Sequence, residues 1–145
     1  MPDINRWDRA HMLSAENYAA LSHARRLRVG CVIVRDQRII SIGYNGMPAG
    51  WDNNCEYEHW HDGIAELQTR PEVLHAESNA IAKLARSNDS GQDADLFITH
   101  SPCLECAKLI YQSGINRVYY GQQYRSDAGI RFLTQSGITV TQTGE

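Results

Sequence analysis

Apolar positions along the chain follow two different repeats, and each repeat predicts a different element. Over residues 6–24 the bulky apolar residues recur at roughly helical spacing, which predicts a first helix. The stretches VGCVIV (29–34) and RIISIGYN (38–45) are instead rich in β-branched residues and predict two strands. Only three polar residues separate these strands, so we expect a β-hairpin.

The periodicity disappears in residues 46–71, GMPAGWDNNCEYEHWHDGIAELQTRP. We interpret this stretch as one long loop. Such loops are uncommon inside compact domains and are often functional, so this loop is a candidate part of a site.

Helical and strand patterns alternate through the second half of the chain. We expect helices at 74–87, 102–112 and 127–135, and strands at 94–100, 117–121 and 137–143. Pro102 at a helix start and Gly114 just past a helix end support these assignments. A hairpin followed by three helix–strand units predicts an α/β domain with a mixed five-stranded sheet. No repeat or linker divides the sequence, so residues 1–145 are expected to form a single domain.

Composition and charge narrow the classes of protein. The chain is 42% hydrophobic and 21% charged, with a net charge of −3. Because nucleic-acid binding usually needs a basic face, we expect no stable binding to nucleic acid. The short basic run HARRLR (23–28) suits one phosphate group, although a solvated helix end would explain it equally well.

The location expected for the protein is the cytoplasm, or the host cytoplasm for a virus-encoded protein. No apolar run approaches the roughly 20 residues of a membrane span. The first residues, MPDINRWDRAHML, carry early charges and lack the apolar region of a secretory signal.

Four cysteines occur in the chain. Without a secretory signal, metal binding or catalysis is a better explanation for them than disulfides. Cys31, inside GCVIV, is expected to be a small buried core residue. Cys103 and Cys106 lie three positions apart at a predicted helix start, which places both sulfurs within reach of one ion.

A histidine and a glutamate begin the helix HAESNAIAKL. Imidazole and thiolate ligands together suit Zn²⁺, so His75, Cys103 and Cys106 are the expected ligands. Three protein ligands leave one position for water, as in catalytic zinc sites, where the pKa of that water falls to about 7. Glu77 is too close to His75 for a second ligand, but it could take a proton from this water and pass it to a leaving group.

These motifs resemble those of a known family. H-x-E with P-C-x-x-C is the signature of zinc deaminases that act on cytosine or adenine. HAESNAI and SPCLECAKLI strongly resemble the cytidine/deoxycytidylate deaminase superfamily. GYNGMPAG (43–50), WDNNCE and CAKLIYQSGINRVYY are similar to deoxycytidylate (dCMP) deaminases in particular. The resemblance covers residues 28–140 and implies a cytidine deaminase-like three-layer α/β/α fold.

The resemblance also implies an activity: hydrolytic, zinc-dependent deamination of dCMP to dUMP and ammonia, which supplies dUMP for thymidylate synthesis. An activated water would attack C4 of the pyrimidine, and Glu77 would move a proton to N3 and to the departing amine. The backbone around Ala76 and Ser101 would meet the base edge, and Asn45 would contact the sugar. From the residues alone, Ser101 could equally be a helix N-cap, and Asn45 a turn residue.

A monophosphate substrate needs a cationic group. Arg26, Arg28 and Arg125 are candidates because arginine binds phosphate bidentately, and we favour Arg26. Tyr124 is expected to stack on or close over the base.

Regulation is a further implication of the resemblance. Deoxycytidylate deaminases are often hexamers that dCTP activates and dTTP inhibits. The effector site would include Gly43, Tyr44, Asn45 and Gly46, and a triphosphate could bring Mg²⁺ with it.

The remaining histidines are not expected to bind metal. Some relatives hold a second zinc near the long loop, but Cys55, His59 and His61 match none of their ligands residue by residue. We interpret them as loop residues without a metal, and His11 and His23 as surface histidines.

Two alternatives stay open at this point. One is a deaminase of free cytidine, deoxycytidine or a nucleic-acid base. The other is a structural zinc module that binds nucleotides without turning them over, which would be indifferent to replacement of Glu77 by glutamine.

Overall fold

The computed structural model describes residues 4–143. The first three residues of MPDINRWDRAHML, the segment in which we expect no secretory signal, lie outside the described residues. None of the helices in this range is long and apolar enough to cross a membrane. The elements in chain order are α1 (Arg6–Ala19), β1 (Gly30–Arg35), β2 (Arg38–Tyr44), β3 (Glu56–His61), β4 (Ile64–Thr69), α2 (Ala76–Ala85), β5 (Asp95–His100), α3 (Leu104–Gln112), β6 (Arg117–Gln122), α4 (Ala128–Gln135) and β7 (Thr139–Gln142).

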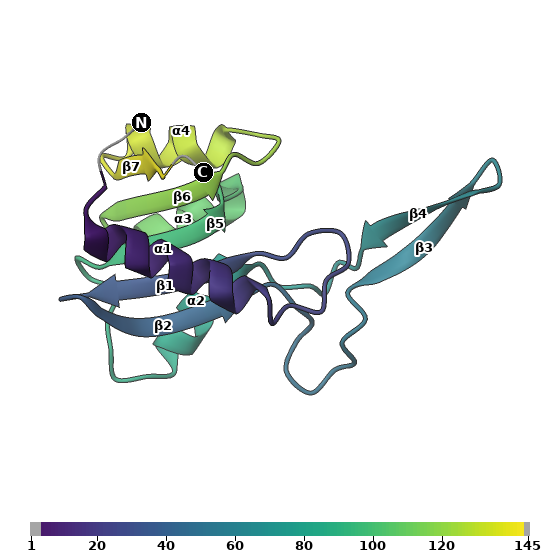
Figure 1. The fold of residues 1–145 in the computed structure, drawn as a ribbon, viewed down its shortest axis with the longest axis horizontal. Coiled ribbons are helices and arrows are strands. Elements are labelled where there is room, and N and C mark those ends of the chain that lie inside the picture. Colours follow the sequence, from purple (N-terminus) through teal and green to yellow (C-terminus); the bar gives the residue numbers. More distant parts are fainter. Residues whose placement is uncertain (1–3, 144–145) are drawn as a thin grey trace.

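Five strands form one mixed sheet in the order β2-β1-β5-β6-β7. β1 is antiparallel to both β2 and β5, whereas β5, β6 and β7 run parallel. Helix α1 packs on one face of the sheet, and α2, α3 and α4 cover the other (Figure 1). The mixed five-stranded sheet between helices is therefore confirmed.

Strand β1 lies between β2 and β5 in the sheet and is buried on both faces. Val32 and Val34 pack against α1, while Cys31 and Ile33 face the cluster formed with α2, α3 and α4. Burial on both faces explains why this strand reads as a continuous apolar run rather than an alternation. Cys31 is fully buried, as predicted.

The turns and helix ends follow the local sequence. Asp36 and Gln37 both have positive φ (53° and 59°), as a two-residue hairpin turn requires, so the β1–β2 hairpin is confirmed. Gly114 follows α3 with φ 86°, in the left-handed region favoured after helix ends. Helix α3 begins at Leu104 with Cys103 as its N-cap, two residues after the predicted start.

Helix α1 ends at Ala19, five residues earlier than predicted. The Ser22 hydroxyl donates to the carbonyl of Asn45 (2.7 Å), and the N–H of Asn45 donates to the carbonyl of Val29 (3.2 Å). These long-range hydrogen bonds hold residues 22–29 beside the end of β2, so the helix cannot continue.

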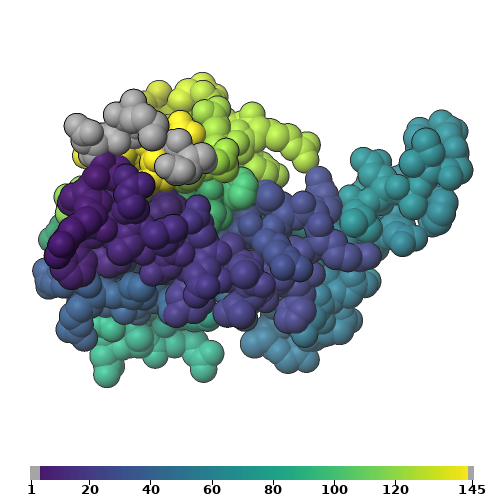
Figure 2. Space-filling view, in the orientation of Figure 1, coloured from purple at the N-terminus to yellow at the C-terminus, as the bar shows by residue number. Residues whose placement is uncertain are grey.

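Interpreting residues 46–71 as one loop was wrong. β3 and β4 form a separate two-stranded sheet in this stretch, and the hairpin extends away from the main body (Figures 1 and 2). Most of its side chains are exposed on both faces, so no apolar alternation marks the strands. The missed signal was Asp62-Gly63, the preferred dipeptide of a two-residue hairpin turn, with φ of 50° and 78°.

Placing His11 at the surface was also wrong. It is 7% exposed, its ring lies 5.2 Å from that of Phe97, and Nε2 is 2.9 Å from Oε1 of Gln37. His11 thus belongs to the packing between α1 and the sheet, whereas His23 is exposed as expected.

Candidate metal centre and active site

Two helix starts bring the three predicted ligands together. His75 is the N-cap of α2, Cys103 is the N-cap of α3, and Cys106 lies in the first turn of α3. Nδ1 of His75 lies 3.6 Å from Sγ of Cys103 and 3.4 Å from Sγ of Cys106. All three ligand atoms lie within 4.8 Å of one another.

This spacing fits a tetrahedral zinc ion. Zn–N bonds of about 2.0–2.1 Å and Zn–S bonds of about 2.3 Å, set at a tetrahedral angle, separate nitrogen from sulfur by about 3.6 Å. The two observed nitrogen–sulfur distances agree with that value. Among residues 4–143, this is the one set of three metal-capable side chains, so Cys55, His59 and His61 form no second one.

The pKa values of the two thiols shift in opposite directions. Hydrogen bonds from Cys106 and His75 lower the pKa of Cys103 to about 3. The pKa of Cys106 is raised, first because its hydrogen donates to Cys103 and then because it is buried. The hydrogen bond with Cys103 also raises the pKa of His75. The surroundings thus favour a thiolate at Cys103, and a bound metal would displace protons from Cys106 and His75.

Glu77 lies in the first turn of α2, two residues after His75, and is 4% exposed. Burial raises the pKa of its carboxyl to about 7. A core rarely holds a carboxylate in this way, and carboxyls with such perturbed pKa values are typical of general acids and bases.

A cavity of about 320 Å³ opens beside these groups. Its volume is in the range of small-molecule sites. The lining comes from the segment before β1, the ends of β2 and β5, the base of the β3–β4 hairpin, the starts of α2 and α3, and the loop after β6. The residues are Ala24, Arg26, Leu27, Val29, Asn45, Cys55, Glu56, Thr69, Val73, His75, Ala76, Glu77, His100, Ser101, Cys103, Tyr124 and Arg125.

Both residues predicted to meet a base edge line this cavity. Ala76 is fully buried in the first turn of α2. Ser101 accepts the N–H of Tyr124 through Oγ (2.7 Å) and donates its own N–H to the carbonyl of Gln122 (2.8 Å). The alternative that Ser101 is a helix N-cap is wrong, since Cys103 occupies that position. The hydroxyl instead ties Tyr124 to the cavity wall.

Asn45 also lines the cavity, and its amide connects two backbone groups. Oδ1 accepts the N–H of Val29 (2.9 Å), and Nδ2 donates to the carbonyl of Leu27 (2.8 Å). Asn45 therefore holds the segment before β1 in place. This role is separate from the predicted contact with a sugar.

The other residues predicted for an effector site do not line the cavity. A Cβ on Gly43 would lie 2.1 Å from the carbonyl oxygen of Ala76, so α2 packs directly on the Gly43 backbone. The carbonyl of Tyr44 accepts from Nδ2 of Asn79 (2.8 Å). Gly46 pairs with Leu74 through two backbone hydrogen bonds, 3.1 and 2.8 Å long. All three of these residues support the start of α2.

Two of the three arginines predicted to bind phosphate line the cavity, and the third does not. Arg26 and Arg125 line the cavity, and Arg26 donates from Nη1 to Oγ1 of Thr69 (3.1 Å). Arg28 does not line it; its Nε donates to the carbonyl of Ala24 (3.3 Å). Of the three candidates for a phosphate contact, two remain.

Three polar residues of the cavity escaped the sequence reasoning: Glu56, Thr69 and His100. Glu56 and Thr69 belong to the β3–β4 hairpin, whose strands carry no apolar pattern in the sequence. His100 ends β5 just before the cysteine motif, and burial lowers its pKa. Only its position next to Ser101, a predicted site residue, could have indicated from the sequence that His100 lines the cavity.

Known proteins share this sequence and fold. The sequence model for the cytidine and deoxycytidylate deaminase zinc-binding region matches residues 5–122. Deoxycytidylate deaminase of Saccharomyces cerevisiae is 40% identical over 94% of this chain, which spans only 44% of the yeast protein. ComE operon protein 2 of Bacillus subtilis is 36% identical over 94% of this chain and 70% of its own length.

A solved structure matches over nearly the whole chain. The crystal structure of dCMP deaminase from the cyanophage S-TIM5 in complex with dCMP and dUMP has a TM-score of 0.87 and 38% sequence identity. The match covers 98% of this chain and 100% of that one. Sequence model, relatives and fold agree, and the chain belongs to the cytidine and deoxycytidylate deaminase family.

Proposed function

We propose that this protein catalyses the hydrolytic deamination of dCMP to dUMP and ammonia with a zinc ion held by His75, Cys103 and Cys106. One observation carries the proposal: a zinc-compatible trio of ligands and a buried carboxylate, Glu77, line or adjoin one cavity that also contains two arginines. The 38% identity to a phage dCMP deaminase solved with dCMP and dUMP supports the choice of substrate.

Zinc in this site would supply Lewis acidity, which makes a water nucleophilic near neutral pH. Glu77 would take one proton from this water and pass it to N3 of the pyrimidine as the oxygen adds to C4. It would then move the second proton, from the new hydroxyl at C4, to the amine, which leaves as ammonia. The backbone at Ala76 and Ser101 offers preoriented groups to the base edge, which lowers the cost of binding. Burial of Glu77 excludes bulk water from the proton transfer.

In this proposal Arg26 selects a nucleotide over a nucleoside, because it binds the phosphate group that a nucleoside lacks. It lines the cavity and is exposed, and no carboxylate within residues 4–143 lies in ion-pair distance of it. An uncompensated guanidinium at a cavity wall suits a phosphate group. Asn45 would contact the sugar, and Tyr124 would close over the base.

An ammonia-release assay on the purified protein tests the proposal. dCMP, deoxycytidine, CMP and single-stranded DNA should be compared, and dCMP is expected to give the highest kcat/KM. A preference for deoxycytidine or for single-stranded DNA would contradict the assignment of the substrate. No release from any substrate, with zinc bound, would favour a binding module.

Regulation and assembly are also part of the proposal, on the strength of the family resemblance. We expect a homo-hexamer in the cytoplasm that supplies dUMP for thymidylate synthesis, with dCTP as activator, dTTP as inhibitor and Mg²⁺ bound with the triphosphate. Gly43, Tyr44, Asn45 and Gly46 would contribute to the effector site. Repeating the assay with each effector, alongside sedimentation analysis, tests these points.

A further inference from the structure

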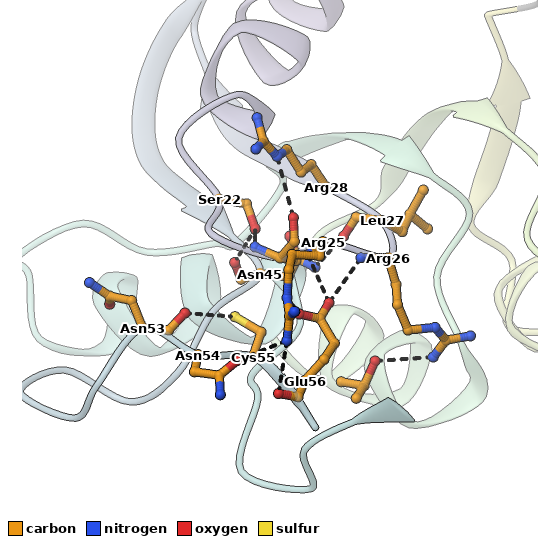
Figure 3. A network of polar contacts seen from close by, with 12 residues as sticks. Ser22, Arg25, Arg26, Leu27, Arg28, Asn45, Asn53, Asn54, Cys55 and Glu56 are labelled. Carbon is orange, nitrogen blue, oxygen red and sulfur yellow. Dashed lines mark hydrogen bonds and ion pairs between the residues drawn. The ribbon is translucent and has the colours of Figure 1, made fainter. Parts of the chain in front are cut away.

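Arg25 and Arg26 are neighbours in sequence but have different surroundings. Nε of Arg25 lies 3.4 Å from Oε1 of Glu56, and its Nη2 donates to Oδ1 of Asn54 (3.1 Å) and to the Glu56 carbonyl (3.2 Å). Arg25 is therefore bound within the protein, and Arg26 alone of the two lines the cavity. Figure 3 shows the two side chains leaving the same turn along different paths.

The carboxylate of Glu56 organises this turn. Glu56 is 1% exposed, and its Oε2 accepts the N–H groups of both Arg25 (2.8 Å) and Arg26 (2.9 Å) (Figure 3). Two consecutive N–H groups that converge on one charged oxygen fix the backbone between them. A buried carboxylate needs such partners, because burying an unpaired charge is costly.

Thr69 holds the far end of the Arg26 side chain. It is the register partner of Glu56 at the open end of the β3–β4 hairpin, and its Oγ1 accepts from Nη1 of Arg26 (3.1 Å). One residue pair of the hairpin thus binds Arg26 at both its backbone and its guanidinium. The rest of that guanidinium is left for a ligand in the cavity.

We infer that Glu56 is a positioning residue for phosphate recognition: together with Thr69 it presets Arg26 to meet the 5′-phosphate of a nucleoside monophosphate. The inference rests on the proposed function, since it places such a substrate in the cavity. Presetting the guanidinium reduces the ordering cost at the moment of binding. Glu56 acts through Arg26 and takes no part in the chemical step.

The variant Glu56→Gln tests this role. Glutamine keeps an oxygen for the two N–H groups but loses the charge and presents an NH₂ group toward Arg25. The turn then spends less time in the binding conformation, and apparent affinity falls by the same fraction. We expect KM for dCMP to rise about tenfold, with kcat within about twofold of wild type. Zinc content and kcat/KM for deoxycytidine should not change.

Two further variants separate the positioning role from a general structural defect: one is a matched control and the other removes the second contact to Arg26. Glu58→Gln removes the same charge from an exposed position of β3, two residues away, and should leave KM for dCMP unchanged. Thr69→Val is at an exposed position and breaks only the bond to Arg26, so KM for dCMP should rise about threefold.

A double-mutant cycle gives the sharpest test. If Glu56 acts through Arg26, adding Glu56→Gln to Arg26→Ala should raise KM no further. Additive effects, an unchanged KM for dCMP in Glu56→Gln, or an equal loss with deoxycytidine would overturn the positioning role and leave the proposed function standing. Failure of the wild-type protein to release ammonia from dCMP would instead refute the proposed function, and this inference with it.

Discussion

The ligand cluster and the arginine turn line or adjoin the same cavity, but they are built in different ways. The ligands lie at the starts of α2 and α3, which the sheet and the core position, and they come from two short motifs. The arginine turn, residues 25–29, has no regular structure. It is held by Asn45 and Glu56, through hydrogen bonds to residues 16 to 31 positions earlier in the chain. The comparison suggests that the chemistry of the site depends on rigid helix ends, whereas substrate choice depends on long-range hydrogen bonds between loops.

The largest expected effect is at the ligand cluster. Cys103→Ala should lose zinc and reduce ammonia release to background, because two ligands hold the ion far less tightly than three. Metal analysis and the assay are the readouts. Cys31→Ala, at a buried cysteine outside the cluster, should retain zinc. Full zinc occupancy in Cys103→Ala would show that the ion is held elsewhere.

Glu77→Gln should separate metal binding from turnover. Loss of the proton-transfer group is expected to lower kcat about 10²–10⁴-fold while zinc content stays at the wild-type level. Parallel metal analysis and steady-state kinetics measure the two properties. Unchanged kcat would mean that Glu77 is a buried structural carboxylate and that the reaction uses another base.

Arg26→Ala probes the second region. Removing a charged hydrogen-bond donor to phosphate should raise KM for dCMP about 10- to 100-fold and leave deoxycytidine turnover unchanged. The ratio of kcat/KM for the two substrates is the quantity to follow. An unchanged ratio would transfer the phosphate contact to Arg125, the other arginine of the cavity.

The smallest effect is expected from Gly43→Ala, which tests the rigidity of the α2 start. The new Cβ would lie 2.1 Å from the carbonyl oxygen of Ala76, so the helix must shift, at a cost of about 1–3 kcal/mol in unfolding free energy. Activity should fall severalfold as His75 and Glu77 move with the helix. Gly46→Ala is the matched control, since a Cβ there meets nothing within 4 Å. Equal denaturation midpoints for both variants would contradict the tight packing at Gly43.

The sequence predicted the first region well because its information is local. Cys103 and Cys106 are three residues apart at a helix start, so their spacing alone places both sulfurs on one side. His75 and Glu77 fall within the start of one helix, so both side chains are fixed by that helix end. The same holds for β1, β5 and β6, whose apolar runs reflect burial in the core. The meeting of His75 with Cys103 and Cys106, 28 and 31 residues further along the chain, is a long-range contact. It was predicted because imidazole and thiolate ligands together suit zinc and because the two motifs resemble those of a known family.

The second region could not be predicted in this way. Glu56 reads as one more charged residue of a polar stretch, and only the folded chain brings it to the N–H groups of Arg25 and Arg26. The β3–β4 hairpin was missed because its exposed faces carry no apolar alternation. Burial of His11 likewise depends on contacts with Phe97 and Gln37, far along the chain.

Zinc K-edge X-ray absorption on the purified protein tests the central claim most directly, because it counts the atoms around the metal. The account predicts two sulfurs at about 2.3 Å, with one nitrogen and one water oxygen at about 2.0–2.1 Å. A shell of four protein ligands, or a sample without zinc, would contradict a catalytic metal held by His75, Cys103 and Cys106.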